Sequence, residues 1–268
     1  MKKYELTDET MTVDGVTYHR IRACKDFDVQ GYHVKAGKFG GYVESECNID
    51  QDGNAWVSGL ALVRGNARVR GNAHVRGNAI VSGNAVVGGG AWVGGNAHVR
   101  GNAWVYGNAR VGGNAWVYGN ARVGGNAWVY DDARVCGNAH VRGNAWISDN
   151  ACVYGNAEVG GNAEVDDNAR VGGNAQICDD AWVGGNAEVN KPSHIIVIGP
   201  IGSRNDYTTF FRSNDNDIIV KCGCFRGNLS EFLKKVNETH GDNKYAAEYR
   251  VAAEIAKRHI DLSEGETE

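Results

Sequence analysis

The segment GPIGSRNDYTTF (residues 199–210) holds the residue types best suited to binding an anion. Gly199 and Gly202 allow a tight turn that exposes backbone N–H groups, and Ser203 and Arg204 place a hydroxyl and a guanidinium beside them. Backbone donors next to an arginine fork suit a phosphate or a carboxylate. A glycine-rich hairpin with one arginine is also often only a hairpin, so both interpretations stay open.

Aromatic and basic residues near this turn extend the candidate site. Tyr207 follows the turn and would stack a base, and further cations and a tyrosine come later in the chain. The sequence therefore predicts a site for a small anionic, nucleotide-like ligand. Its predicted residues are Gly199, Gly202, Ser203, Arg204, Tyr207, Arg212, Arg226, Tyr249 and Arg250.

Cys222, Cys224 and His240 also suggest chemistry in this region. The C-x-C spacing differs from the two-residue spacing typical of a zinc knuckle, and no fourth ligand is evident. Residues two apart on a strand share a face, so both thiols are expected to be buried. We therefore expect no metal site, no cofactor and no catalytic residue.

Strands and helices are expected to position these residues in a small α+β module over residues 191–268. Strand composition marks residues 194–199, 206–212 and 218–222. Asn228 and Glu231 form a capping-box pattern that opens a helix through about Val236. A second helix is expected from about Tyr245 to Arg258, followed by an acidic tail.

The chain from Gly53 to Asn190 repeats a six-residue unit, G-N-A-x-V-x, 23 times without an insertion. The alanine and the valine of a unit point to the same side of a short strand, while the residue between them points away. The Gly-Asn pair tolerates positive φ and makes one bend per unit. Residues 53–190 are therefore expected to coil into a solenoid.

Composition narrows the class of protein. The chain has 38 glycines and 2 prolines in 268 residues, and its formal charge of −4 does not indicate a nucleic-acid-binding protein. No run of about 18 apolar residues occurs, so we expect no membrane span. Seven cysteines without a disulfide-like pattern are expected to be free thiols in a cytoplasmic protein.

The repeat resembles that of hexapeptide-repeat proteins with a left-handed parallel β-helix. An aliphatic residue is followed four positions later by a small one, as in Val105–Ala109 and Val111–Ala115, over about half of the chain. The resemblance implies an all-β solenoid with three units per coil and an interior too narrow for a ligand. Residues 1–52, with a hairpin pattern around Asp14-Gly15, are expected to form a β cap on the first coil.

Both ends also resemble phage and prophage proteins. The N-terminal segment is similar to the start of hexapeptide-repeat proteins of bacterial genomes and prophages that are grouped with acyltransferases. The C-terminal segment resembles phage proteins that share a GCF-x-G stretch followed by EF…V…HGD, here residues 223–227 and 231–242. These resemblances imply a viral or mobile-element origin and no particular reaction.

With three units per coil, the outward residues sort onto three walls. An aromatic stripe on a rigid surface is typical of an interface, although tryptophans also ladder along a β surface without any partner. We expect a homotrimer, as in many relatives of this fold. Its predicted interface is the wall that carries Trp56, Trp92, Trp128, Trp146 and Trp182.

Acyltransferase activity, with a histidine as general base, is the enzymatic function that the resemblance implies. Such enzymes usually interrupt the repeat with a loop, whereas this repeat is uninterrupted, and His74, His98 and His140 fall on three different walls. We therefore expect a non-enzymatic, oligomeric binding protein of phage origin that sequesters a small nucleotide-like host signal. An acyltransferase and a scaffold for a host protein partner remain the alternatives.

Overall fold

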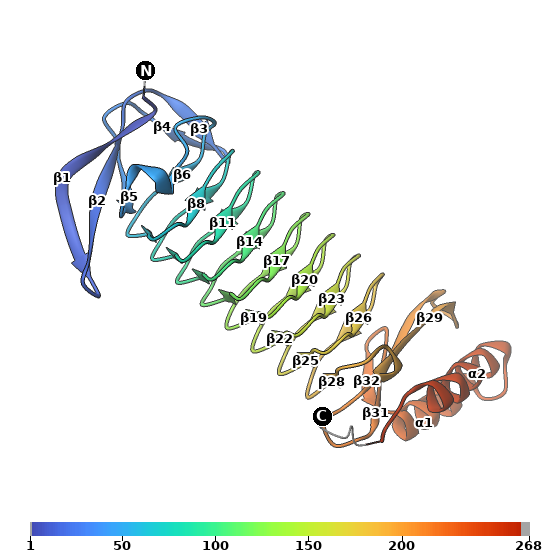
Figure 1. Cartoon of the computed structure of the whole chain (residues 1–268). Helices are drawn as coiled ribbons and strands as arrows, with labels where there is room; N and C mark the ends of the chain where they lie inside the picture. The colour runs from blue at the N-terminus through green and yellow to red at the C-terminus, as the bar shows by residue number, and fades with distance from the viewer. Residues whose placement is uncertain (1, 264–268) are drawn as a thin grey trace.

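The computed structural model describes residues 2–263 of the chain. The molecule is elongated, with a β-rich cap at one end, a solenoid in the middle and a small sheet-and-helix module at the other end (Figure 1). The predicted β-helix with its two end structures is confirmed, and the handedness of the coil stays a prediction. None of the helices in the described residues is long and apolar enough to span a membrane.

The solenoid strands pair in parallel with the strands 18 residues away, and the predicted sorting of outward residues onto three walls is confirmed. The first wall contains β6 (Trp56–Val57), β9 (His74–Val75), β12 (Trp92–Val93), β15 (Arg110–Val111), β18 (Trp128–Val129), β21 (Trp146–Ile147), β24 (Glu164–Val165) and β27 (Trp182–Val183). The second wall contains β7 (Leu62–Val63), β10 (Ile80–Val81), β13 (His98–Val99), β16 (Trp116–Val117), β19 (Arg134–Val135), β22 (Cys152–Val153), β25 (Arg170–Val171) and β28 (Glu188–Val189). The third wall contains β8 (Arg68–Val69), β11 (Val86–Val87), β14 (Trp104–Val105), β17 (Arg122–Val123), β20 (His140–Val141), β23 (Glu158–Val159) and β26 (Gln176–Ile177).

Alanine and valine fill the interior of the solenoid. No inward alanine, valine or isoleucine from Ala55 to Val189 is more than 1% exposed. Backbone N–H groups of one coil donate to carbonyls of the next, as the Trp92 N–H does to the Ala109 oxygen at 2.9 Å. The solenoid is therefore a packed core that leaves its chemistry to the outward side chains.

The Gly-Asn pair has two separate roles at the corners. The glycine adopts a left-handed conformation, with φ of 74° at Gly119, and Asp131 adopts the same conformation with φ of 57° where the repeat lacks glycine. The asparagine instead forms a ladder along the corner. The side-chain amide of Asn102 donates to Asn120 at 3.0 Å, and Asn120 donates to Asn138 at 2.9 Å.

The N-terminal cap contains a long hairpin of β1 (Tyr4–Val13) and β2 (Val16–Ala23). It also contains β3 (Phe27–Val29), β4 (Tyr32–Val34), β5 (Phe39–Val43) and the 3-10 helix η1 (Glu46–Asn48). Strand β5 pairs antiparallel with β2 and parallel with β7, so it joins the hairpin to the second wall.

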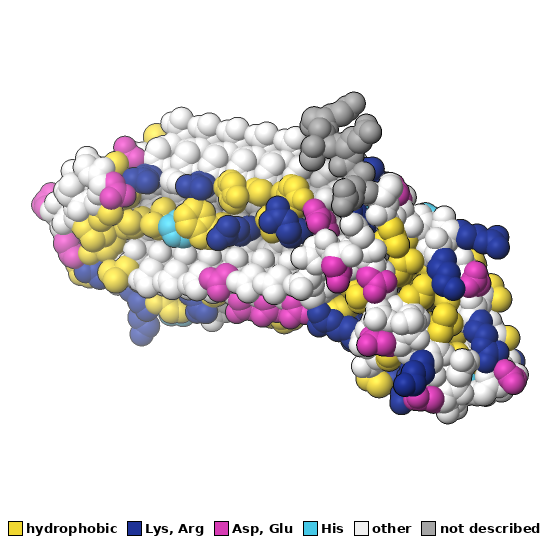
Figure 2. Space-filling view, turned by 90° about the horizontal axis from the view of Figure 1, so that it is seen from below, with side chains coloured by type: hydrophobic (Ala, Val, Ile, Leu, Met, Phe, Trp, Pro, Cys, Tyr) yellow, Lys and Arg dark blue, Asp and Glu magenta, His cyan; other side chains and the backbone are white. Residues whose placement is uncertain are grey.

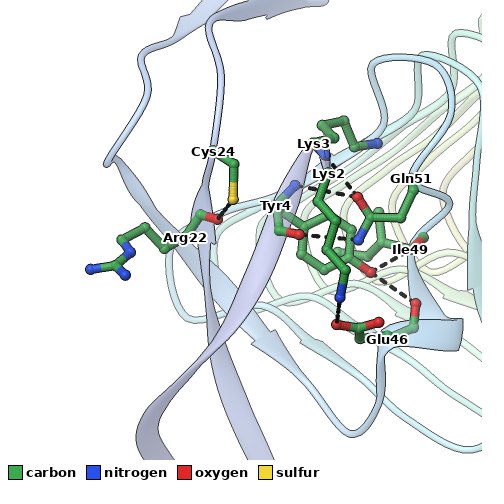
Figure 3. Close-up of polar contacts among 8 residues, drawn as sticks. All are labelled: Lys2, Lys3, Tyr4, Arg22, Cys24, Glu46, Ile49 and Gln51. Carbon is green, nitrogen blue, oxygen red and sulfur yellow. Dashed lines mark hydrogen bonds and ion pairs between the residues drawn. The ribbon is translucent and has the colours of Figure 1, made fainter.

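Hydrogen bonds hold the start of β1 against the first coil (Figure 3). The Tyr4 hydroxyl donates to the carbonyl oxygens of Glu46 and Ile49, both at 2.8 Å. The Gln51 side chain bonds the backbone of Lys3 and Tyr4. The first residues of the chain are thereby tied to residues more than forty positions later.

The C-terminal module begins with the 3-10 helix η2 (Pro192–His194) and a four-stranded antiparallel meander. Its strands are β29 (Ile195–Ile201), β30 (Asp206–Arg212), β31 (Ile218–Cys222) and β32 (Phe225–Asn228), followed by α1 (Leu229–His240) and α2 (Lys244–His259). The sequence predicted three of these strands and both helices. It missed β32, which is only four residues long, and it ended the first helix four residues early.

The two faces of this sheet have different neighbours. Ile195 and Phe211 pack against the solenoid interior and close its last coil, whereas Phe210 and Val220 pack against α1 and α2. Alternate residues of one strand thus belong to two separate cores. The module covers the open end of the solenoid with one face and carries its helices on the other.

Candidate functional site

The predicted glycine-rich loop is mostly strand. Residues 199–201 belong to β29, and the turn covers only residues 202–205. The N–H of Gly202 donates to the Glu248 carboxylate at 2.7 Å, and a Cβ on Gly202 would lie 1.9 Å from the Tyr249 hydroxyl oxygen. The prediction of a free backbone donor is therefore wrong for Gly202, because Glu248 already accepts that bond.

Arg212 and Arg226 do not join the predicted site. Arg212 is buried and donates from Nε to the Asn216 side chain at 3.0 Å. Arg226 pairs with Asp167 at 2.8 Å and lies over the Trp182 ring at 4.7 Å, so it connects the module to the solenoid. Each of these two cations thus has a structural partner away from the groove, and their predicted binding of a ligand stays a prediction.

Arg250, Tyr207 and Gly199 also lie outside the site. Arg250 donates to the Asn237 side chain at 2.7 Å and to the Gly241 carbonyl at 2.8 Å, at the end of α1. Tyr207 lines a separate hollow on the solenoid side of the sheet. A Cβ on Gly199 would lie 2.7 Å from the Tyr207 Cα, so Gly199 serves the packing of two strands. These three residues therefore do not line the groove that holds Ser203 and Arg204, and their predicted role in binding stays a prediction.

Ser203, Arg204 and Tyr249 do come together, in a groove between the end of the sheet and α1. The groove has a volume of about 430 Å³. Aromatic rings form its base, and hydroxyl, thiol and basic groups line its rim. Its lining residues are Ser203, Arg204, Cys222, Cys224, Phe225, Phe232, Lys235, Val236, Thr239, His240 and Tyr249.

The charged side chains of the groove favour a negatively charged ligand. Arg204 and Lys235 are the groove's two permanent cations, and no carboxylate is among the lining residues that the structure describes. Each cation has only a loose ion pair, at 4.0 Å with Asp206 and 3.7 Å with Glu238. Both side chains are more than half exposed, so these pairs are screened and leave the cations available to a ligand.

The Tyr249 hydroxyl is a neutral hydrogen-bonding group in this groove. Burial raises the pKa of Tyr249 to about 12, with a further contribution from the nearby Cys222 thiol. Ser203 lies beside this hydroxyl and partly offsets the rise in the pKa of Tyr249. At neutral pH the groove therefore offers the hydroxyls of Ser203, Thr239 and Tyr249 and two cations beside its aromatic rings.

The residues Cys222, Cys224 and His240 all line the groove. Cys222 is half-buried and accepts a bond from the Thr208 hydroxyl at 3.3 Å, but Cys224 is exposed. The prediction of a buried pair is wrong for Cys224, because it lies in the turn after β31 and not on the strand. Within residues 2–263 no group of three potential metal ligands is present.

Sequence reasoning missed the contribution of α1 to the groove. Lys235, Thr239 and His240 lie at helical spacing from Phe232, so one face of α1 carries all four. The signal was present in the sequence. It was lost because the helix was ended at Val236, which left Thr239 and His240 in an expected loop.

The ends of the chain cover two of the five tryptophans that were predicted to form an oligomer interface on the first wall. Trp56 is fully buried beneath the N-terminal cap, with its ring 5.4 Å from Phe27. Trp182 packs against Phe211 of the C-terminal module at 6.0 Å. Trp56 is therefore inaccessible to an oligomer interface, and the module partly covers Trp182, whose role at an interface stays a prediction.

The middle of the first wall is a ladder of stacked rings. Trp92 stacks on Tyr130 at 6.3 Å, and Trp128 stacks on Trp146 at 5.0 Å. Trp146 remains 43% exposed. Figure 2 shows one side of the solenoid, on which a row of hydrophobic, histidine and basic side chains runs along the axis, without labelling the wall. Part of the aromatic stripe thus has partners within the chain.

The solenoid histidines lie on three separate walls, on β9, β13 and β20. His74 is buried, with Nε2 at 2.8 Å from the Ser58 hydroxyl and its ring stacked on Tyr32. His98 stacks on Trp116 with a centroid distance of 4.2 Å. Their side chains are engaged in packing on different walls, and no two of them face a common site in one chain.

The fold defines a β-solenoid protein with a capped N-terminal end and a C-terminal sheet-and-helix module. The chain is similar to a family model described as the YdcK β-solenoid repeat, which matches residues 103–119 and 115–131. Comparison with curated proteins gave no significant match. The family match thus supports the solenoid, and the module with the groove lies outside it.

Proposed function

We propose that the protein is a non-catalytic binding protein whose C-terminal groove holds a small anion with an apolar or nucleotide-like part. The observation that carries the proposal is the convergence of Arg204 and Lys235 on one groove without a carboxylate among its described lining residues. Phe225, Phe232 and Tyr249 offer a base for a flat or apolar group. A volume of about 430 Å³ suits a ligand of nucleotide size.

The resemblance of the C-terminal sequence to phage proteins favours binding without turnover. A phage protein that removes a host signal needs affinity and stoichiometric amounts, and it does not need a catalytic constellation. The proposed role is therefore sequestration of a small host signal, with the solenoid as a rigid support. Binding of a host protein through the same groove is the alternative. In that case no small molecule should bind in calorimetry.

Calorimetry on the full chain tests this proposal, with inorganic phosphate, nucleoside monophosphates and cyclic nucleotides as ligands. Loss of a charge-assisted hydrogen bond costs about 1.5–3 kcal/mol, so Arg204→Ala should weaken binding roughly ten- to a hundredfold. Lys235→Ala should weaken it in the same direction. Lys234→Ala is the matched control, because Lys234 is the neighbouring lysine of α1 and does not line the groove.

Two results would contradict the proposal. One is the absence of any ligand in the panel that binds below millimolar concentration. The other is an Arg204→Ala variant that binds as tightly as the wild type. Equal losses in Lys234→Ala and Lys235→Ala would show that general charge, and not the groove, controls binding.

Self-association through the middle of the first wall is part of this proposal. Trp92, Trp128 and Trp146 remain outside both end structures, and a trimer along them would bring three grooves to one end of the assembly. Light scattering on the wild type and on Trp128→Glu tests this arrangement. A trimer that the substitution dissociates supports the wall as an interface, and a monomeric wild type at micromolar concentration argues against it.

A further inference from the structure

Trp104 differs from the other tryptophans of the chain. Within residues 2–263, each of the other six forms a ring pair with an aromatic or histidine side chain, whereas Trp104 forms no such pair. Its side chain is 44% exposed on the third wall, and Tyr106 next to it is 42% exposed. The indole therefore has no aromatic partner among the described residues, and arginine side chains lie over it instead.

A notch lies beside this indole, because the coil before it carries only small side chains. Val86 and Gly88 stand there, between the coil of Arg70 and the coil of Trp104. The notch has a volume of about 350 Å³ and is lined by Arg70, Val86, Gly88, Gly89, Trp104, Val105, Tyr106 and Arg122. Two coil steps span roughly 10 Å, which leaves room for one flat ring between the outer side chains.

Arginines border the notch on both sides. The Arg70 guanidinium lies 5.7 Å from the centre of the Trp104 ring, and the Arg122 guanidinium lies 5.8 Å from it on the other side. Gly88 makes room for Arg70, since a Cβ there would lie 3.3 Å from the Arg70 side chain. A bulkier residue would push Arg70 away from the indole.

The positive charge around the notch has no acidic partner among residues 2–263. Arg68, Arg70 and Arg122 form no ion pair with any acidic residue of the described chain. Arginines gathered around an exposed indole attract an anion, and an aromatic ring next to them stacks a planar group.

We propose that this notch is a second binding site, for a flat aromatic ring that carries a negative charge. The ring would lie on the face of the Trp104 indole that Arg70 covers, with Val86 behind it. Arg70 would hold the anionic group, and Arg122 would add positive charge from the other face of the indole. Arg70 is on the exposed rim, so a small movement of its side chain admits a ring between guanidinium and indole. Nucleoside monophosphates and aromatic carboxylates share this chemistry. The site is independent of the groove in the C-terminal module.

The experiment uses the full-length Arg204→Ala variant, in which the groove is weakened, so that binding at the notch is read separately. Adenosine monophosphate and phthalate are the two anionic rings, adenosine is a ring without charge, and inorganic phosphate is a charge without a ring. Calorimetry should show one site for at least one anionic ring. Adenosine and phosphate should each bind at least tenfold more weakly. Binding of adenosine monophosphate would indicate a nucleotide ligand, and binding of phthalate would indicate an aromatic carboxylate.

Substitutions locate the site. Arg70→Ala should weaken binding about tenfold or more. Arg110→Ala is the matched control, because Arg110 lies over the Trp128 ring on the first wall, away from this notch. Val86→Trp should abolish binding, because it fills the notch with an outward ring. Thermal melting checks that the Val86→Trp variant folds. Arg70 is exposed, so Arg70→Ala should fold normally and tests the same site independently.

Three results would overturn the proposal. They are no binding by either anionic ring, binding of phosphate as tight as that of the rings, and unchanged binding by Arg70→Ala or by a folded Val86→Trp variant. Failure of the groove proposal would appear differently, as unchanged binding when Arg204 is substituted in an otherwise wild-type chain.

Discussion

The solenoid and the C-terminal module differ in what determines the surroundings of a side chain. In the solenoid, the position of a residue within the six-residue unit is enough to determine its surroundings. Each inward alanine or valine is buried, and each outward residue lies on a known wall. In the module, neighbouring residues of one strand face two different cores, as Phe210 and Phe211 do. A repeat therefore specifies shape from local sequence, whereas the groove depends on packing between distant segments.

The largest expected effect is at the junction between the two regions. Phe211 is fully buried against the last coil, so Phe211→Ala should lower the free energy of unfolding by about 3–5 kcal/mol. Tyr207→Ala is the control on the same strand, because Tyr207 is 37% exposed, and it should change stability by roughly 0.5 kcal/mol or less. Chemical denaturation measures both, and equal losses would mean that the module does not close the solenoid.

The fold was more predictable than the site for a physical reason. Strands of the solenoid pair with strands 18 residues away, so a strict repeat determines its own neighbours. No repeat determines the neighbours of the candidate site residues. Arg226 was predicted to bind a ligand, but its partner Asp167 lies 59 residues earlier on the solenoid. Ser203 and Arg204 lie together at the groove because the turn that holds them is local.

Acid should weaken the first coils more than the module. Burial lowers the pKa of His74 to about 4, with a smaller contribution from Arg76. The unfolded chain therefore binds a proton near pH 6.5 that the folded chain resists, so stability is complete above about pH 6.5 and falls as the pH drops towards 4. The free energy of unfolding should fall by about 3 kcal/mol over this pH range.

His74→Gln isolates this contribution, because glutamine keeps a polar partner for Ser58 without a titrating ring. Denaturation at pH 7 and at pH 4.5 should show a smaller acid-induced loss in His74→Gln than in the wild type. His194, whose pKa burial also lowers, remains in both proteins. An identical pH dependence in the two proteins would show that His74 does not sense acid in the folded state.

The smallest expected effect is at the surface contact between the two regions. Arg226 and Asp167 are both more than 40% exposed, so Arg226→Ala should cost no more than about 1 kcal/mol, including the contact with Trp182. Arg142→Ala removes an exposed pair with Glu158 within the third wall and serves as the control. A loss of several kcal/mol in Arg226→Ala, measured by denaturation, would show that this pair and not Phe211 holds the module in place.

Hydrogen–deuterium exchange of the full chain, with and without a nucleotide that binds, tests most directly whether the module carries the binding function. The proposed groove predicts added protection in the turn at residues 202–205, in residues 222–225 and along residues 232–240. The Arg204→Ala variant should lose that protection at the same ligand concentration. Unchanged exchange in these three segments, in a sample that calorimetry shows to be saturated with ligand, would contradict the assignment of binding to the groove.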